Sequence, residues 1–154
     1  MATRYAHVNI MAADWQRLAD FYEAVFDCEP VSSERDHHGP HIDALTAEPG
    51  QRFRGRHLRV PGHGENGPTI EIFSPSTPGD NSGKRLTRSG FSHVAFEVDD
   101  VDAKRAQIKE LGGDDYGELV SIDIAGAGLL TLIYMSDPEG NVVELQKWNR
   151  VESD

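Results

Sequence analysis

Tyr5-Ala6-His7-Val8, near the start of the chain, recurs in the second half as Phe91-Ser92-His93-Val94. Thr69-Ile70-Glu71-Ile72 has a similar counterpart in Val142-Val143-Glu144-Leu145. Each half therefore opens with a histidine in an apolar, strand-like run and closes with a glutamate in another. Repetition of this kind indicates a duplicated architecture. The sequence predicts two similar modules, each with one imidazole and one carboxylate at corresponding places.

The first half predicts a strand, a helix and three further strands. Asp14 is a typical helix N-cap, and the apolar residues behind it recur at helical spacing. Residues 61–68 are dense in glycine and proline, which predicts a loop between two strands. The predicted strands cover residues 5–11, 41–46, 53–60 and 69–73.

The second half predicts the same order. Asp99-Asp100 is expected to cap a helix over residues 101–111, which Gly112-Gly113 ends. The predicted strands cover residues 91–98, 118–124, 129–135 and 142–146. We therefore predict a single domain built of two modules, with its parts at 4–75 (first module), 76–90 (linker), 91–148 (second module) and 149–154 (frayed polar tail).

This order of elements predicts an α+β fold made of two βαβββ modules. A four-stranded sheet with one helix leaves one sheet face uncovered. Two such modules are therefore expected to form a curved mixed sheet with the helices outside. A ligand site is expected on the concave inner face, because small molecules bind in concave surfaces.

The composition limits the partners of the chain. Its 154 residues carry a formal net charge of −11, from 26 acidic and 15 basic side chains. Nucleic acids and anionic membranes are bound by clustered Lys and Arg, so neither is expected as a partner. Cys28 is the one cysteine, which excludes an intrachain disulfide, and no stretch has the pattern of a secretory signal or a membrane span. We expect a cytoplasmic protein that binds a small-molecule substrate.

The repeated histidines and glutamates are a suitable ligand set for a divalent metal ion. Imidazole nitrogens and carboxylate oxygens bind Zn²⁺, Ni²⁺, Co²⁺, Fe²⁺ and Mn²⁺. An octahedral ion with four protein ligands keeps two positions open, as a catalytic metal requires. Each residue taken singly is better explained as a polar residue on the wet face of a strand. The joint repetition favours metal ligation by His7, Glu71, His93 and Glu144.

Several motifs together resemble the vicinal oxygen chelate superfamily, which contains glyoxalase I, methylmalonyl-CoA epimerase, extradiol dioxygenases, and fosfomycin and bleomycin resistance proteins. The resemblance covers residues 4–148, and its most specific motif is Asp137-Pro138-Glu139-Gly140-Asn141 before the strand at 142–145. The other motifs lie at residues 5–8, 18–22, 70–72 and 91–96. The resemblance implies paired βαβββ modules and metal ligation by His7, Glu71, His93 and Glu144.

Two histidines with two glutamates look most like the ligand set of glyoxalase I. The resemblance then implies a lyase or isomerase of the lactoylglutathione lyase type, acting by proton transfer next to a metal-bound oxygen of a small molecule. Glu144 or Glu71 would act as the base. Similar small proteins usually form homodimers, and in some of them both chains contribute to the metal site.

Three alternatives remain open: an epimerase of the methylmalonyl-CoA type, an Fe-dependent dioxygenase, and a non-catalytic small-molecule binding protein that confers resistance. Glyoxalase I holds glutathione carboxylates with basic and amide side chains near the first strand and after the second ligand. Here Asn9, Met11 and Ser74-Pro75 occupy those places, which argues against glutathione. An epimerase has a further catalytic glutamate just before the strand at 53–60, where this chain offers no clean match.

Several other polar residues near that strand are candidates for a functional role. Gln51, Glu48 and Asp43 lie near the epimerase position. The histidines His37, His38 and His41 are expected to be solvated rather than a second metal site, and His57 is a candidate to line the pocket. The stripe of Arg52, Arg54, Arg56 and Arg59 is either a solvated strand face or a clamp for an anionic substrate.

Overall fold

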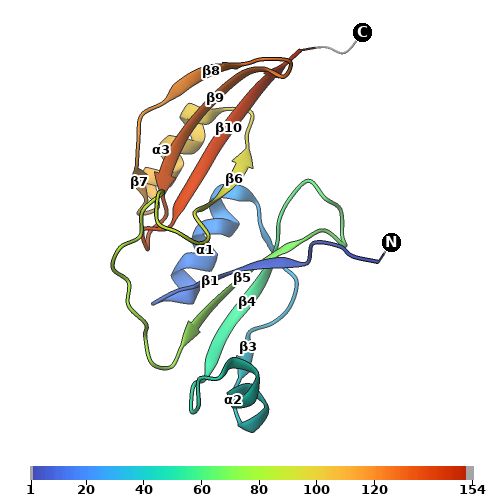
Figure 1. Ribbon diagram of the computed structural model, residues 1–154, viewed down its shortest axis with the longest axis vertical. Coiled ribbons are helices and arrows are strands. Elements are labelled where there is room, and N and C mark those ends of the chain that lie inside the picture. Colours follow the sequence, from blue (N-terminus) through green and yellow to red (C-terminus); the bar gives the residue numbers. More distant parts are fainter. Residues whose placement is uncertain (1, 152–154) are drawn as a thin grey trace. The chain divides into compact units, whose positions relative to one another are not determined.

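The computed structural model describes residues 2–151 and divides into two compact units, Met1–Asp80 and Asn81–Asp154. Each unit has a mixed sheet of five strands, and a long helix packs on that sheet (Figure 1). The prediction of an α+β fold with two similar modules is confirmed. Across residues 2–151, the helices are too short or too polar to span a membrane.

The strands of unit 1 are hydrogen bonded in the order β1-β5-β4-β2, and β3 also pairs with β4. β1 and β5 are parallel, while the pairs that involve β4 are antiparallel. The elements are β1 (His7–Met11), α1 (Trp15–Phe26), β2 (Glu29–Pro30), β3 (Arg35–His37), α2 (Pro40–Thr46), β4 (Phe53–Arg59) and β5 (Thr69–Pro75).

Unit 2 repeats this topology, with strand order β6-β10-β9-β7 and β8 paired with β9. β6 and β10 are again parallel. The elements are β6 (His93–Glu97), α3 (Val101–Glu110), β7 (Asp114–Asp115), β8 (Val120–Ile124), β9 (Gly128–Ser136) and β10 (Val142–Arg150). The strands β1, β5 and β4 thus correspond to β6, β10 and β9.

Both long helices begin at the predicted caps. The Asp14 carboxylate accepts a hydrogen bond from the backbone N–H of Arg17 at 3.2 Å, and Asp100 accepts one from Ala103 at 2.9 Å. These bonds satisfy N–H groups that have no partner within the helix. α1 then buries an apolar face against β4 and β5, formed by Trp15, Leu18, Ala19, Phe21, Tyr22, Val25 and Phe26.

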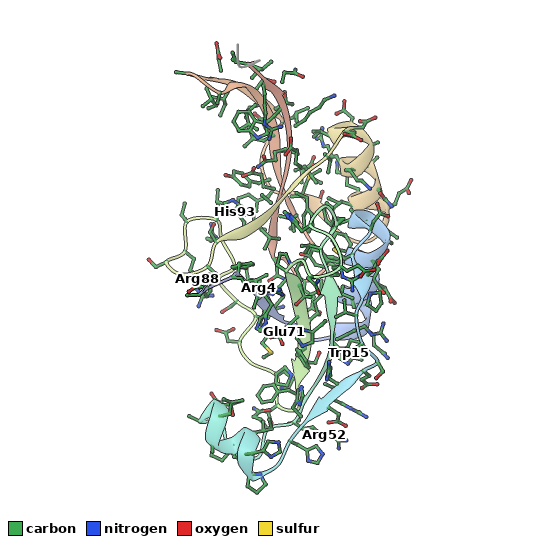
Figure 2. All side chains as sticks on the ribbon, turned by 90° about the vertical axis from the view of Figure 1, so that its right-hand side faces the viewer. Arg4, Trp15, Arg52, Glu71, Arg88 and His93 are labelled. Atoms are coloured by element: carbon green, nitrogen blue, oxygen red, sulfur yellow. The ribbon has the colours of Figure 1, made fainter. Side chains whose placement is uncertain are left out.

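Strand alternation separates a helix-covered sheet face from a functional one. Ser74 accepts a hydrogen bond from the N–H of Trp15 at 3.0 Å, so the even-numbered side chains of β5, Ile70 and Ile72 among them, face α1. Glu71 therefore lies on the opposite face, and Figure 2 shows Glu71 and Trp15 on different sides of this sheet. On β10, Glu144 likewise alternates with the buried Val143 and Leu145.

The structure corrects the expectation of a strand at residues 41–46, which form the helix α2. Gly39 has φ +101° and precedes Pro40 at the helix start, where proline's fixed φ and missing N–H suit a first turn. Figure 1 shows α2 beside the ends of β3 and β4.

Other boundaries also differ from the expectation. β2, β3 and β7 were not predicted, because strands of two or three residues are too short to show an alternating pattern. β10 continues to Arg150, whose guanidinium donates a hydrogen bond to Glu97 at 2.7 Å, so residues 149 and 150 belong to a strand rather than to the expected frayed tail. Residues 152–154 of that tail lie outside the described residues.

β5 ends at Pro75, which is also the last residue of the expected first module. Whether the two units make a single domain stays a prediction.

Candidate metal centre

Strand register brings the first histidine of each unit to the last glutamate of the same unit. On the parallel pair β1–β5, His7 lies opposite Thr69, two residues before Glu71. On β6–β10, His93 lies opposite Val142, two residues before Glu144. Residues two apart share a strand face, so each histidine and glutamate meet on the face away from the helix. The sequence repeat is thus a repeat of geometry within each unit.

In unit 1 the Glu71 carboxylate is held between two imidazoles. His7 Nε2 lies 2.9 Å from Glu71 Oε1, and His57 Nε2 lies 2.9 Å from Glu71 Oε2. His57 is the cross-strand partner of Glu71 on β4. Asn9 also donates to Glu71 Oε1, at 3.4 Å. Each oxygen of Glu71 therefore has an imidazole neighbour.

The surroundings of His57 differ from those of His7. The His57 side chain is 22% exposed, against 44% for His7. Burial lowers the pKa of His57, although the nearby Glu71 carboxylate opposes this effect. His57 Nδ1 lies 3.4 Å from the hydroxyl of Thr69, which directs the Nε2 atom toward Glu71. The sequence suggested that His57 lines the pocket. In the structure, His57 contacts Glu71 and is not among the residues that line the pocket.

In unit 2 the Glu144 carboxylate is more buried than Glu71. Its side chain is 10% exposed, and its Oε1 lies 3.4 Å from His93 Nε2. Its other oxygen accepts a hydrogen bond from Gln146 Nε2 at 2.6 Å, and Trp148 Nε1 donates to Gln146 Oε1 at 2.7 Å. Tyr134, the cross-strand partner of Glu144, has a raised pKa because of burial and the adjacent Glu144 carboxylate.

The hydrogen bonds around His93 permit a ring tautomer that leaves a lone pair facing Glu144. When the Ser92 hydroxyl donates to the carbonyl of Leu86 at 2.7 Å, Ser92 Oγ can accept from His93 Nδ1–H at 3.0 Å. A neutral His93 then has a lone pair on Nε2, opposite Glu144 Oε1. Two electron-rich atoms facing each other at 3.4 Å are stabilised by a cation. The donor set and its tautomer therefore fit a metal ion.

Neither unit alone brings enough ligands to one point. Across residues 2–151, no group of three or more His, Cys, Asp or Glu side chains is arranged to hold a metal ion. Unit 1 offers His7, His57 and Glu71 as possible ligands, and unit 2 offers His93 and Glu144.

A pocket of about 710 Å³ adjoins Glu71 in unit 1. β5 contributes Glu71 and Phe73 to its wall, and helix α2 contributes Ile42 and Leu45. Volumes of this size are typical of small-molecule sites. The carboxylate of the unit-1 pair therefore has direct access to a cavity for a ligand.

The arginine stripe, which begins at Arg52 just before β4 and continues along β4, contacts other protein groups. Arg52 forms two hydrogen bonds with Asp36, and this pairing lowers the pKa of Asp36. Arg54 lies 3.4 Å from Glu34, and Arg59 lies 3.5 Å from Glu29. The guanidinium of Arg56 lies over the ring of Trp15, 5.3 Å from its centre. These contacts agree with a strand face that offsets acidic neighbours.

The residues near the expected epimerase position support the pocket wall. Gln51 Oε1 accepts hydrogen bonds from Ser76 and from the N–H of Thr77, both at 3.1 Å. Asp43 accepts one from the N–H of Gly50 at 2.9 Å. Gln51 and Glu48 line the pocket. Of the clustered histidines, His37 also lines it, with its ring 5.8 Å from that of Phe73.

Sequence reasoning did not single out Tyr134, Gln146 and Trp148. Alternation along β10 gives Glu144, Gln146 and Trp148 one shared face, which was a readable signal. The position of Tyr134 opposite Glu144 follows from the β9–β10 register, which no local sequence pattern predicts.

The fold and the two pairs define a class of proteins: two similar α+β modules, each with a histidine on its first strand and a glutamate on its last strand. The chain belongs to the glyoxalase/bleomycin resistance protein/dioxygenase superfamily, whose family model matches residues 4–145. This confirms the superfamily indicated by the sequence motifs. A comparison with curated proteins gave no match.

Solved structures with this fold include a glyoxalase family protein from Bacillus cereus, with a TM-score of 0.79 at 19% identity over 99% of this chain and 97% of that one. A glyoxylase/bleomycin resistance protein/dioxygenase domain from Frankia sp. EAN1pec has a TM-score of 0.61 at 17% identity, over 97% and 94%. The fosfomycin resistance protein FosX from Listeria monocytogenes, solved with Mn(II) and sulfate, has a TM-score of 0.56 at 19% identity, over 96% and 93%.

Proposed function

We propose that the chain is a metal-dependent lyase or isomerase of the glyoxalase I-like branch. In this proposal the two pairs together hold one divalent ion, which is Zn²⁺, Ni²⁺, Co²⁺, Fe²⁺ or Mn²⁺. The observation that carries it is the same register of a histidine and a glutamate in both units. The Mn(II) in the FosX structure supports a divalent ion in this fold. The four ligands are His7, Glu71, His93 and Glu144.

A bound ion would act as a Lewis acid and stabilise negative charge on a substrate oxygen. The other steps are assigned to individual side chains of this site. Glu71 lines the pocket, which supports its carboxylate as the base that takes a proton from a carbon beside a carbonyl group. His57 holds one oxygen of Glu71 and orients the other. Glu144, held by Gln146, serves first as a ligand.

The proposal includes a homodimer in the cytoplasm with a small-molecule substrate. Superfamily proteins bind small molecules and commonly form dimers. In a dimer, the four ligands come either from one chain or from two, and the pairs described above are compatible with both.

Metal analysis combined with a proton-exchange assay tests the proposal. The metal-loaded protein is incubated in D₂O with two hemithioacetals of phenylglyoxal, one made with glutathione and one with the uncharged thiol 2-mercaptoethanol. We expect replacement of the substrate C–H proton by deuterium, and loss of this exchange after chelation. Metal binding without proton exchange in either adduct would support the metal site and exclude the proposed reaction.

A second candidate is a binding protein that sequesters a small molecule without catalysis. The pocket of about 710 Å³ favours it, because binding alone needs no metal. Tight ligand binding by the metal-free protein, with no gain when metal is added and no proton exchange, would support sequestration over catalysis.

A further inference from the structure

We propose that the pocket between α2 and Glu71, here called the α2 pocket, binds the apolar and uncharged part of the ligand. This inference rests on the proposed function for the chemistry at Glu71. It adds the substrate class: an uncharged molecule with an apolar body and an oxygen group at one end.

The lining of the α2 pocket is mainly apolar. β1, β4 and β5 form one wall, and α2 forms another. Apolar surface of this kind gains about 25 cal/mol for each Å² that a ligand removes from water. The apolar lining side chains are Met11, Ile42, Leu45, Phe53, Phe73, Pro75 and Pro78.

The charged groups at the α2 pocket disfavour anions. Glu48 and Glu71 line it, and His37 is the basic side chain among the described lining residues, which include no Lys or Arg. The nearby Arg52 is paired with Asp36 rather than directed to the pocket. An anionic ligand would meet Glu48 and, in the metal-free protein, Glu71 as well, in a chain of net charge −11. Glutathione adducts and phosphonates are therefore poor fits.

The exposed apolar side chains at the α2 pocket indicate that a ligand covers them. Leu45 is 80% exposed and Met11 is 48% exposed, although both line the cavity. Contiguous exposed apolar surface of this kind marks interaction sites. The carboxylate of Glu71 is the polar group at the same cavity, so an apolar body here leaves a polar end beside the candidate metal ligands.

Two fluorescent probes with similar ring systems test the charge preference. N-phenyl-1-naphthylamine is uncharged, and 1-anilinonaphthalene-8-sulfonate carries one negative charge. Both are titrated into metal-free protein. We expect the uncharged probe to bind about tenfold more tightly or better, and Leu45→Arg to weaken it about tenfold. Leu119→Arg, at a 38% exposed leucine of unit 2, is the matched control and should change nothing.

A second variant keeps the test valid if Leu45→Arg disturbs α2. Met11→Lys, on β1, places a cation at the α2 pocket and should shift the preference toward the sulfonate. Equal binding of both probes, or binding unaffected by both variants, would overturn the inference. So would a wild-type dimer that Leu45→Arg separates while probe binding persists, because the apolar surface would then be a contact between copies.

These results separate the inference from the proposed function. Probe binding with no metal binding would support the α2 pocket as a ligand site and exclude the proposed enzymatic function. Metal binding and proton exchange without preference for the uncharged probe would keep the enzyme and overturn this substrate class.

Discussion

Glu71 and Glu144 occupy equivalent positions but have different cross-strand neighbours. Glu71 faces an imidazole, His57, whereas Glu144 faces the phenol of Tyr134. Glu71 lines the α2 pocket, and Glu144 is fixed by a chain of side-chain amide and indole hydrogen bonds. The duplicated fold thus gives two carboxylates with different surroundings, and we propose that Glu71 acts as the base while Glu144 acts as a ligand.

Amide substitution of each glutamate distinguishes these roles. Glu71→Gln removes the proton acceptor at the pocket and should lower kcat by about 10²- to 10⁴-fold. Glu144→Gln should abolish turnover mainly by weakening metal binding. Metal affinity and kcat are measured for both variants. Full turnover by metal-loaded Glu71→Gln would exclude Glu71 as the base, and retained turnover in Glu144→Gln with bound metal would remove Glu144 from the mechanism.

His57 should act as a positioning residue for Glu71. His57→Leu removes the hydrogen bond to Glu71 Oε2 and should weaken metal binding by about 10- to 100-fold, as is typical of partners of metal ligands. His57→Gln retains a donor and should recover part of the affinity. Calorimetric titration with Co²⁺ measures both, with His63→Gln in an exposed loop as control. Unchanged affinity in His57→Leu would show that the contact has no part in metal binding.

Cys28 should make the protein less stable at high pH. Burial raises the pKa of this thiol from 9.0 to about 12, because the thiolate is disfavoured away from water. A raised folded-state pKa gives stability that is complete below pH 9 and is lost as the pH rises toward 12. Unfolding by urea between pH 8 and 11 should show a steeper loss for wild type than for Cys28→Ala. Parallel curves would contradict the burial argument.

Among the secondary-structure elements, the turn before β10 determines where Glu144 lies. Asp137 accepts hydrogen bonds from the N–H groups of Glu139 and Asn141, at 2.9 and 3.0 Å, and from the Asn141 side chain at 2.9 Å. Gly140 in this turn has φ +86°, a value that favours glycine. The motif at residues 137–141, which is the most specific one for the superfamily, thus forms the turn that sets the position at which β10 begins.

Loss of the Asp137 carboxylate should destabilise unit 2. Asp137→Ala leaves two backbone N–H groups without their acceptor and should reduce the free energy of unfolding by about 1–3 kcal/mol. Asp123→Ala, the same change at an exposed position of β8, should have little effect. Thermal and urea unfolding compare the two. Equal stability of Asp137→Ala and wild type would contradict this role of the turn.

The sequence was informative about elements with strong local signals. Asp14 and Asp100 located the starts of α1 and α3 because a cap is a local feature. Residues 41–46 were misassigned, since six residues do not distinguish a helix from a strand by periodicity. The repeat indicated the four candidate ligands, but His57 and Tyr134 became visible only through cross-strand register. Long-range pairing of this kind has no signature within a single strand.

For the whole molecule, we propose that the two units contribute jointly to one ion. Each unit supplies an imidazole and a carboxylate with the same register. Joint ligation therefore predicts that a substitution in either unit removes the same binding event. Separate weak sites would instead respond one at a time.

Calorimetric titration of Co²⁺ into wild type, His7→Ala and His93→Ala tests this claim most directly. The account predicts one ion per chain in wild type and at least a 100-fold loss of affinity, about 2.7 kcal/mol, in each variant. His38→Gln, an exposed histidine outside the site, is the control. Absence of Co²⁺ binding in wild type, or unchanged affinity in either alanine variant, would contradict the account.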